Sequence, residues 1–340
     1  EGLCDVGNGN KMKDVKKIGY KGIGFKSVFM RSSHVTVESG GYCFKFDKKH
    51  WDNYWDIHWN PEKYGLKDED KKYSMPWQII PIEAQTPIQI DSEGYNVVTY
   101  IQVGEKTNLE DKVSNLLSNS QFLLFLKSKN IRMEFIADGL SKCIIEKSEN
   151  NGKVILSVNG IEDSRWLIHV NESVDVPNEL RSLIRADINT PDKLKEAKTF
   201  DLSFAIALEG NDKLKPLSKE QSVIYTYLPT SYHFGSEGFP FLVNANFITD
   251  AGRQQLHKDS EWNKLIFSKI PYEFLSWISD ISSSYKNYWE ILPEKSYGKG
   301  NPLEIIYADE MVNAIKKIAF IPSLQNVNQK VLVADAFMDR

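Results

Sequence analysis

The sequence has few cysteines and no long apolar run. Its three cysteines, Cys4, Cys43 and Cys143, form neither a C-x-x-C pair nor a zinc-binding spacing. We therefore expect buried free thiols in a reducing compartment, with the cytoplasm as the default location. No stretch of about 20 apolar residues predicts a membrane-spanning helix, and the first residues do not resemble a signal peptide.

A strong net charge is also missing. The chain has 42 Lys and Arg against 46 Asp and Glu, which gives a formal net charge of −4 at pH 7. This balance argues against binding of nucleic acid over the whole surface, although a local basic face is compatible with it. The length of 340 residues leaves room for two domains, and 41% hydrophobic residues are enough for ordinary cores.

The most informative feature is a glycine-rich run that opens a predicted helix, Phe25 to Arg31. Glycine permits positive φ and close approach of the backbone, and the apolar residues that follow recur at helical spacing. This arrangement leaves main-chain N–H groups at a helix N-terminus directed at an anion. Lys21 and Lys26 add positive charge for a phosphate. The glycines are Gly19, Gly22 and Gly24.

A flexible turn before a core helix would explain the same glycines. The run is not the P-loop pattern, which needs G-x-x-x-x-G-K-[ST]. It is not a dinucleotide fingerprint either, because the polar segment Asn8 to Lys17, rather than an apolar strand, precedes it. A polar segment in this place suggests a lid.

The run Ile18 to Phe29, followed by the strand-like segments His34 to Ser39 and Tyr42 to Asp47, resembles the second glycine box of a known ATPase superfamily. That superfamily includes gyrase B, the 90-kDa heat-shock chaperone, histidine kinases and MutL. Its sacsin-like branch, with the plant NO VEIN proteins, fits best because a segment like Leu3 to Lys11 precedes the box there. The resemblance implies an α+β chain that starts with a two-layer α/β sandwich ATPase domain, whose first helices are absent from this sequence.

The same resemblance implies a site for ATP and Mg²⁺. Asn8 to Lys17 would be the lid, and the main chain of Gly22 to Phe25 would donate to the phosphates. The family's catalytic glutamate, its magnesium-binding asparagine and its adenine-binding aspartate all precede the lid, so no metal ligand is assigned. Adenine recognition would involve the strand Asn96 to Val103, where Tyr95, Asn96 or Thr99 stands in for the family's threonine. The implied nucleotide-binding residues are Lys11, Gly19, Lys21, Gly22, Ile23, Gly24, Phe25, Lys26, Ser27 and Asn96.

Four further segments occur in the order seen in the sacsin and NO VEIN group: Val223 to Thr230, Gly238 to Phe247, Asp250 to Leu256 and Asp259 to Asn263. They imply an α/β middle domain resembling that of the 90-kDa heat-shock chaperone. In that chaperone, an arginine of the corresponding loop reaches the γ-phosphate of ATP. Arg253 would inherit this catalytic role, since a guanidinium suits developing phosphoryl charge. A surface ion pair is the alternative.

We predict an ATPase-like domain over residues 1–137 and a middle-like domain over residues 138–340. The first contains an irregular, aromatic-rich insertion near residues 48–77, which either packs on the sheet as a satellite cluster or stacks nucleobases. Expected elements include a hairpin turned by Gly40 and Gly41, a polar loop over 209–221, and a strand at 223–227 paired with the strand at 200–208. The expected helices are 109–126 in two short pieces, 262–267, 271–289 and 303–319.

Two functions remain open. The first is an ATP-binding and ATP-hydrolysing conformational module of a larger chaperone-like, defence or nucleic-acid-linked protein. The second is a non-hydrolysing scaffold that keeps the fold and binds a partner protein. The expected partners are ATP and further domains of the parent protein. Dimerisation, common in the resembled family, is compatible with the sequence, whereas membrane binding is not expected. We expect the sequence by itself to be inactive, because the upstream catalytic residues are missing.

Overall fold

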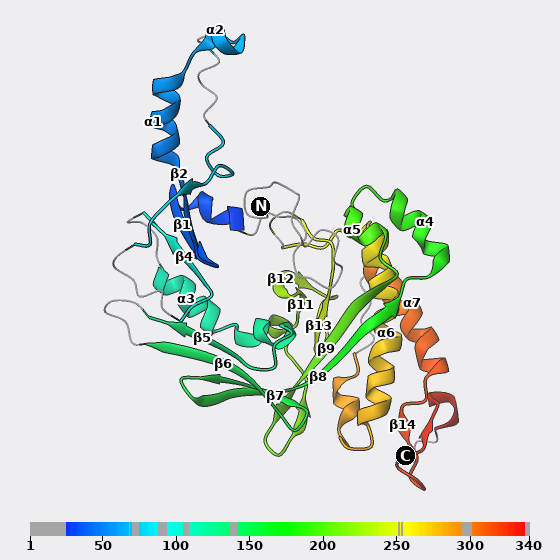
Figure 1. The fold of residues 1–340 in the computed structure, drawn as a ribbon. Coiled ribbons are helices and arrows are strands. Elements are labelled where there is room, and N and C mark those ends of the chain that lie inside the picture. Colours follow the sequence, from blue (N-terminus) through cyan, green and yellow to red (C-terminus); the bar gives the residue numbers. More distant parts are fainter. Residues whose placement is uncertain are drawn as a thin grey trace. The chain divides into compact units, whose positions relative to one another are not determined.

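The computed structural model describes residues 25–67, 69, 75–87, 94–104, 109–136, 142–250, 252, 254–293 and 301–336. The chain forms two compact units, residues 1–109 and 110–340, whose elements are labelled in Figure 1. The architecture is mixed α/β, with an antiparallel sheet in the first unit and a larger mixed sheet in the second. The boundary that we predicted from the sequence lies further along, after residue 137, whereas residues 110–136 pack with the second unit.

The first unit contains a four-stranded sheet in the order β3-β2-β1-β4. The glycine pair at its central turn has φ values of 58° and 82°, as a two-residue hairpin turn requires. The predicted hairpin is therefore confirmed. The strands are β1 (His34–Ser39), β2 (Tyr42–Asp47), β3 (Ile82–Glu83) and β4 (Val97–Ile101).

A helical turn, η1 (Phe25–Met30), packs on this sheet. The sequence predicted a helix at residues 25–31, and the structure has a 3-10 helix there. The ring of Phe29 lies 5.3 Å from that of Phe46 and 5.0 Å from that of Trp77. Phe46 and Trp77 are buried, so the sequence after the glycine run is fixed to the sheet by an aromatic core.

The aromatic-rich segment after β2 begins with two helices, so the prediction that it is irregular is wrong for residues 48–58 and 61–64. Asp47 caps helix α1 (Lys48–His58), its carboxylate accepting a hydrogen bond from the His50 amide at 3.1 Å. A shorter helix, α2 (Pro61–Tyr64), follows in Figure 1. No residue of α1 is fully buried. The Trp51 indole donates to the carbonyl of Ile80 at 2.9 Å, so the segment is tied to the chain that leads into β3.

The second unit is built on a mixed sheet in the order β12-β11-β13-β9-β8-β7-β6-β5, with β10 paired to β9. The predicted pairing of residues 223–227 with 200–208 is wrong, because β13 lies between these two strands and runs parallel to β11. The segment 209–221 is also not a plain loop, since it contains β10. The strands are β5 (Ile131–Phe135), β6 (Cys143–Asn150), β7 (Lys153–Val158), β8 (Ile161–Asp175), β9 (Thr199–Glu209), β10 (Lys213–Lys215), β11 (Val223–Thr226), β12 (Leu228–His233) and β13 (Leu242–Ala245).

One face of this sheet packs against helix α6 (Glu261–Ile281), which in turn contacts α7 (Pro302–Lys317). Phe204 of β9 lies 5.6 Å from Phe274 of α6, ring to ring. Helix α6 continues through Pro271, although we predicted a break there. A proline inside a helix costs about 3 kcal/mol, and the buried apolar faces on both sides of it outweigh that cost.

The opposite face carries a second core beneath α3 (Leu109–Leu117) and η3 (Ser120–Phe125). Phe122, Leu123, Leu124 and Phe125 are all buried there, which confirms that the apolar run is core. Each central strand can face both cores because its side chains alternate. The remaining elements are α4 (Asn178–Ala186), α5 (Asp192–Lys195), η4 (Lys219–Gln221), η5 (Tyr288–Ile291), β14 (Ile321–Pro322), β15 (Lys330–Val331) and η6 (Val333–Asp335).

Candidate functional site

The predicted nucleotide site is only partly within the described residues. Phe25, Lys26, Ser27 and Asn96 belong to them. The other predicted site residues lie outside the described residues and stay predictions. They are Lys11, Gly19, Lys21, Gly22, Ile23, Gly24 and Arg253.

Two neighbouring residues at the start of η1, Phe25 and Lys26, have different surroundings. The Phe25 ring packs 5.7 Å from Phe29 and 5.9 Å from Phe46, so it holds the end of the glycine run on the sheet. The ammonium of the next residue, Lys26, is buried and has no hydrogen-bond partner among the described residues. A buried cation is costly unless an anion is close. As far as the described residues show, the turn therefore presents a buried ammonium without a hydrogen-bond partner, directly after the glycine run in the sequence.

The predicted adenine-binding residue lies in an open position. Asn96 is exposed and directly precedes β4, an edge strand of the four-stranded sheet as far as the described residues show. Thr99, on β4 itself, is exposed as well. Neither side chain is enclosed by the described residues, in contrast to Lys26.

The two chain segments that flank Arg253 are hydrogen-bonded to each other. Thr249 and Leu256 form an isolated antiparallel bridge, and the Asp250 carboxylate accepts a hydrogen bond from the Gln254 amide at 2.8 Å. The Asp250 amide in turn donates to the Gln255 carbonyl at 3.0 Å. Asp250 on one side of residue 253 is therefore hydrogen-bonded to Gln254 and Gln255 on the other side.

The first turn of helix α6 is hydrogen-bonded to the segments on both sides of this loop. Asn263, which is fully buried, accepts from the Ile248 amide at 2.8 Å and donates to the carbonyls of Ile248 at 2.8 Å and His257 at 3.0 Å. The neighbouring Trp262 donates from its indole to the Asn246 carbonyl at 2.9 Å. The first turn of α6 therefore fastens both stems of the loop. The sequence segment Asp259 to Asn263 gains a physical role that its residues alone do not reveal.

The first unit contains a cavity of about 780 Å³ beside the C-terminal end of η1. It is lined by Arg31, His34, Asp47, Lys48 and Lys49 among others. Burial alone would raise the pKa of Asp47, but hydrogen bonds from the Lys45 ammonium and the His50 amide outweigh it and lower the pKa. The lining includes Phe29 to Ser33 at the C-terminal end of η1, whereas the glycine run comes before Phe25 in the sequence.

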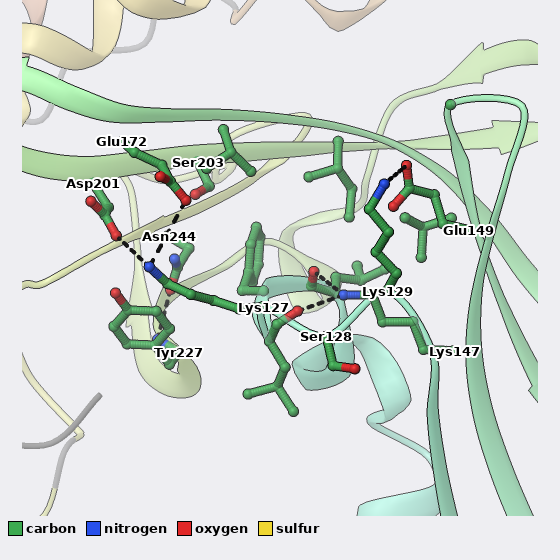
Figure 2. Close-up of a pocket in the computed structure, with 17 residues that line it drawn as sticks. Lys127, Ser128, Lys129, Lys147, Glu149, Glu172, Asp201, Ser203, Tyr227 and Asn244 are labelled. Carbon is green, nitrogen blue, oxygen red and sulfur yellow. Dashed lines mark hydrogen bonds and ion pairs between the residues drawn. The ribbon is translucent and has the colours of Figure 1, made fainter. Parts of the chain in front are cut away.

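A second cavity, of about 360 Å³, lies in the second unit on the face of the sheet that carries η3. Figure 2 shows lysines and carboxylates gathered along its wall. Lys147 projects from β6 into this face and is only 6% exposed. Its ammonium donates to the carbonyls of Leu124 at 3.0 Å and Leu126 at 2.7 Å, and burial lowers its pKa.

The opposite end of the cavity is strained and acidic. Tyr227 has a positive φ of 65°, which is rare for a residue with a side chain. Its amide donates to the Asn244 side chain at 2.6 Å, which holds this conformation. Burial, and then the nearby Asp201 carboxylate, raise the pKa of Tyr227 to about 12. The phenol is therefore neutral at physiological pH.

Sequence reasoning overlooked this cavity, although one signal was present. In β6, Ile145 and Lys147 occupy alternate positions and share the buried face of the strand. A lysine at an inward strand position is unusual, since lysine is almost never buried without partners. The partners here are the main-chain carbonyls of Leu124 in η3 and of Leu126 directly after it, which no local pattern predicts.

No group of three or more His, Cys, Asp or Glu within the described residues could hold a metal ion. Cys43 and Cys143 are free thiols and are half-buried rather than buried. No helix in the part of the chain that the structure covers is both long and apolar enough to cross a membrane.

Comparison with known proteins reveals one distant relationship. The chain is 22% identical over 318 residues to Protein NO VEIN from Arabidopsis thaliana, and the match covers 86% of this chain. The chain spans about 10% of the length of that relative. No protein-family model matches the chain, and no solved structure matches it. The relationship to a NO VEIN-like protein therefore agrees with the resemblance seen in the sequence.

Proposed function

We propose that the chain carries the phosphate-binding part and the arginine loop of an ATPase module. The first unit would belong to the two-layer sandwich of the superfamily that includes gyrase B, and the second would correspond to the middle domain of the 90-kDa heat-shock chaperone. In the parent protein the module would bind and hydrolyse ATP to drive movement between domains. That parent would be chaperone-like or linked to defence or nucleic acid, and its location cytoplasmic.

The observation that carries the proposal is the buried ammonium of Lys26. It lies at the start of η1, directly after the glycine run, and has no hydrogen-bond partner among the described residues. An ammonium withdrawn from water needs an anion, and a phosphate supplies charge-assisted hydrogen bonds. The chemistry of the donor set, ammonium and main-chain N–H groups of Gly22 to Phe25, fits a polyphosphate.

The loop of Arg253 supports the second half of the proposal. An arginine that stabilises phosphoryl charge must be held in place rather than carried by a loose chain. The stems of this loop are fixed by three hydrogen bonds to Asn263. ATP binds such modules with Mg²⁺, which neutralises phosphate charge. We assign this chain no magnesium ligand.

A non-hydrolysing scaffold is the second candidate, and the exposure of the adenine strand favours it. Asn96 and Thr99 both face solvent in the described part of the first unit. The helix α1 also carries aromatic side chains without one that is fully buried, which suits a protein-binding surface. On this view, the chain keeps the fold but binds a partner.

Nucleotide binding to the 340-residue chain tests the phosphate cradle. The substitution Lys26→Gln should weaken ATP binding about ten-fold or more and leave adenosine binding unchanged, because one charge-assisted hydrogen bond is lost. The matched control is Lys67→Gln, at a side chain that is 81% exposed. Equal affinities of wild type and Lys26→Gln for ATP would contradict the cradle.

ATP turnover by the intact parent protein separates the two candidates. A strong loss of turnover in Arg253→Ala, with nucleotide binding retained, would support hydrolysis with this arginine as a catalytic residue. If the unmodified parent shows no turnover at all, the scaffold is the better description.

A further inference from the structure

Two tight turns of the second unit contain the same dipeptide, Asn-Gly. Asn151 and Gly152 join β6 to β7, and Asn159 and Gly160 join β7 to β8. In both cases the flanking strands pair directly up to these two residues, so each turn is a two-residue hairpin turn. The three strands are neighbours in the sheet of Figure 1. The two turns therefore form a matched pair within one sheet.

The two turns also share their backbone conformation. Asn151 and Gly152 have φ values of 50° and 74°, and the values for Asn159 and Gly160 are 52° and 78°. Positive φ at both central positions is typical of a type I′ turn, and Asn-Gly is the preferred dipeptide there. All four residues are exposed. Neither the φ values nor the exposure class distinguishes one turn from the other.

The surroundings of the two asparagine side chains differ. The Asn159 side chain accepts a hydrogen bond from the Ile144 amide at 2.8 Å, and the Asn159 amide donates to the Ile144 carbonyl at 2.8 Å. Asn159 is thereby attached to β6 as well as to its own turn. Among the described residues, no corresponding hydrogen bond is formed by the Asn151 side chain, which lies at the end of the β6–β7 hairpin.

Asn-Gly is a dipeptide in which asparagine readily loses ammonia, because glycine has no side chain to shield the following amide nitrogen. That nitrogen attacks Cγ of the asparagine, the side-chain nitrogen leaves as ammonia, and a five-membered succinimide forms. Water then opens the ring at one of its two carbonyl carbons, which gives aspartate or isoaspartate. In total, one side-chain amide and one water molecule become one carboxylate and one ammonium ion.

The hairpin conformation restricts this reaction, since the ring closes only when the turn opens locally and the main chain rearranges. At residues 159–160 such an opening must also break the two hydrogen bonds to Ile144, whereas at residues 151–152 it breaks neither of them. Two hydrogen bonds correspond to about a ten-fold or larger difference in the population of the open state. The same chemistry should therefore proceed at different rates in the two turns.

We propose that Asn151 is a site of spontaneous hydrolytic deamidation in the folded chain, and that Asn159 is protected by its hydrogen bonds to Ile144. The modification adds one negative charge to the turn between β6 and β7. Where the product is isoaspartate, the main chain of this two-residue turn also becomes longer by one methylene group, which loosens the hairpin as the protein ages. The site is independent of the proposed ATPase function.

Peptide mapping by mass spectrometry tests the proposal on the 340-residue chain, kept at neutral pH either folded or unfolded in urea. In the folded chain, the peptide with Asn151 should deamidate about ten-fold faster or more than the peptide with Asn159. In urea the two rates should be similar, because the dipeptide is the same. Equal rates in the folded chain, or faster conversion at Asn159, would overturn the proposal, as would a rate ratio in urea as large as that in the folded chain.

Two substitutions assign the reacting residue. Asn151→Gln should abolish the fast conversion of its peptide, because the longer side chain no longer forms a five-membered ring. Asn150→Gln is the matched control, at the exposed neighbouring asparagine, which does not precede glycine, and it should leave the rate unchanged. If the peptide of Asn151→Gln deamidates as fast as that of the wild type, Asn151 is not the site and the proposal is wrong.

Discussion

The substitution Asn263→Ala should loosen the loop that contains Arg253. Asn263 makes three buried hydrogen bonds to the stems of that loop. Both main-chain acceptors keep another partner, since the Ile248 carbonyl accepts from the His257 amide and the His257 carbonyl accepts from the Ser260 amide. The Ile248 amide is then the group left without a partner.

These contacts set the size of the effect. An unpaired buried N–H costs about 1–3 kcal/mol, and each of the two other lost hydrogen bonds contributes about 1 kcal/mol. The local opening of the loop should therefore become about 3–5 kcal/mol easier. A change of about 3 kcal/mol corresponds to more than a hundred-fold faster amide exchange wherever exchange requires that opening.

Hydrogen exchange measured residue by residue is the appropriate assay, because it reports on the loop without assuming that the two units unfold together. The amides of Ile248 and His257 should exchange much faster in Asn263→Ala, while those of the central strand β9 change less. Ser276→Ala, at an exposed position of the same helix, is the control. An acceleration below about ten-fold, or one equal to that of Ser276→Ala, would refute the anchoring role.

Three further changes test other parts of the chain. Burial lowers the pKa of His169, whose ring stacks with Phe204 and Trp277. The unfolded state therefore binds more protons than the folded state, and the free energy of unfolding should fall as the pH drops below about 6.5. If the urea midpoint of His169→Phe has the same pH dependence as that of the wild type, this reasoning is wrong. Gly41 has a φ of 82°, so Gly41→Ala should lower the free energy of unfolding by about 1–2 kcal/mol, whereas Gly104→Ala, at an ordinary φ with open space around it, should not. Lys21→Ala should weaken binding of ATP more than of adenosine, and an equal loss for both in a titration would argue against a phosphate role.

The elements that the sequence predicted well are those determined by neighbours in the chain. The hairpin of β1 and β2 follows from two glycines between alternating strands, and both glycines have the positive φ that the turn needs. The apolar run at Phe122 is core because no other place accepts consecutive large apolar side chains. The strand β9 was predicted from the alternation of side chains in Asp201 to Leu208.

The errors arose where distant segments decide the outcome. The position of β11 depends on β13, which arrives later in the chain and takes the inner place. Helix α6 keeps Pro271 in its interior because packing outweighs the local cost. The glycine run could be found from the sequence. The hydrogen bonds from Asn263 to the stems of the Arg253 loop could not, because they involve main-chain groups of Ile248 and His257, which carry no residue-specific signal.

The inner place of β13 has a consequence for synthesis of the chain. Residues Leu202 to Ala205 of β9 pair with β13, and β11 reaches the sheet only by lying beside β13. Until Leu242 has left the ribosome, that stretch of β9 therefore has no neighbour on one side, although β11 and β12 are already made. An uncovered strand edge of this kind favours pairing with wrong partners, so a pause in translation before Leu242 has left the ribosome would increase the risk of aggregation.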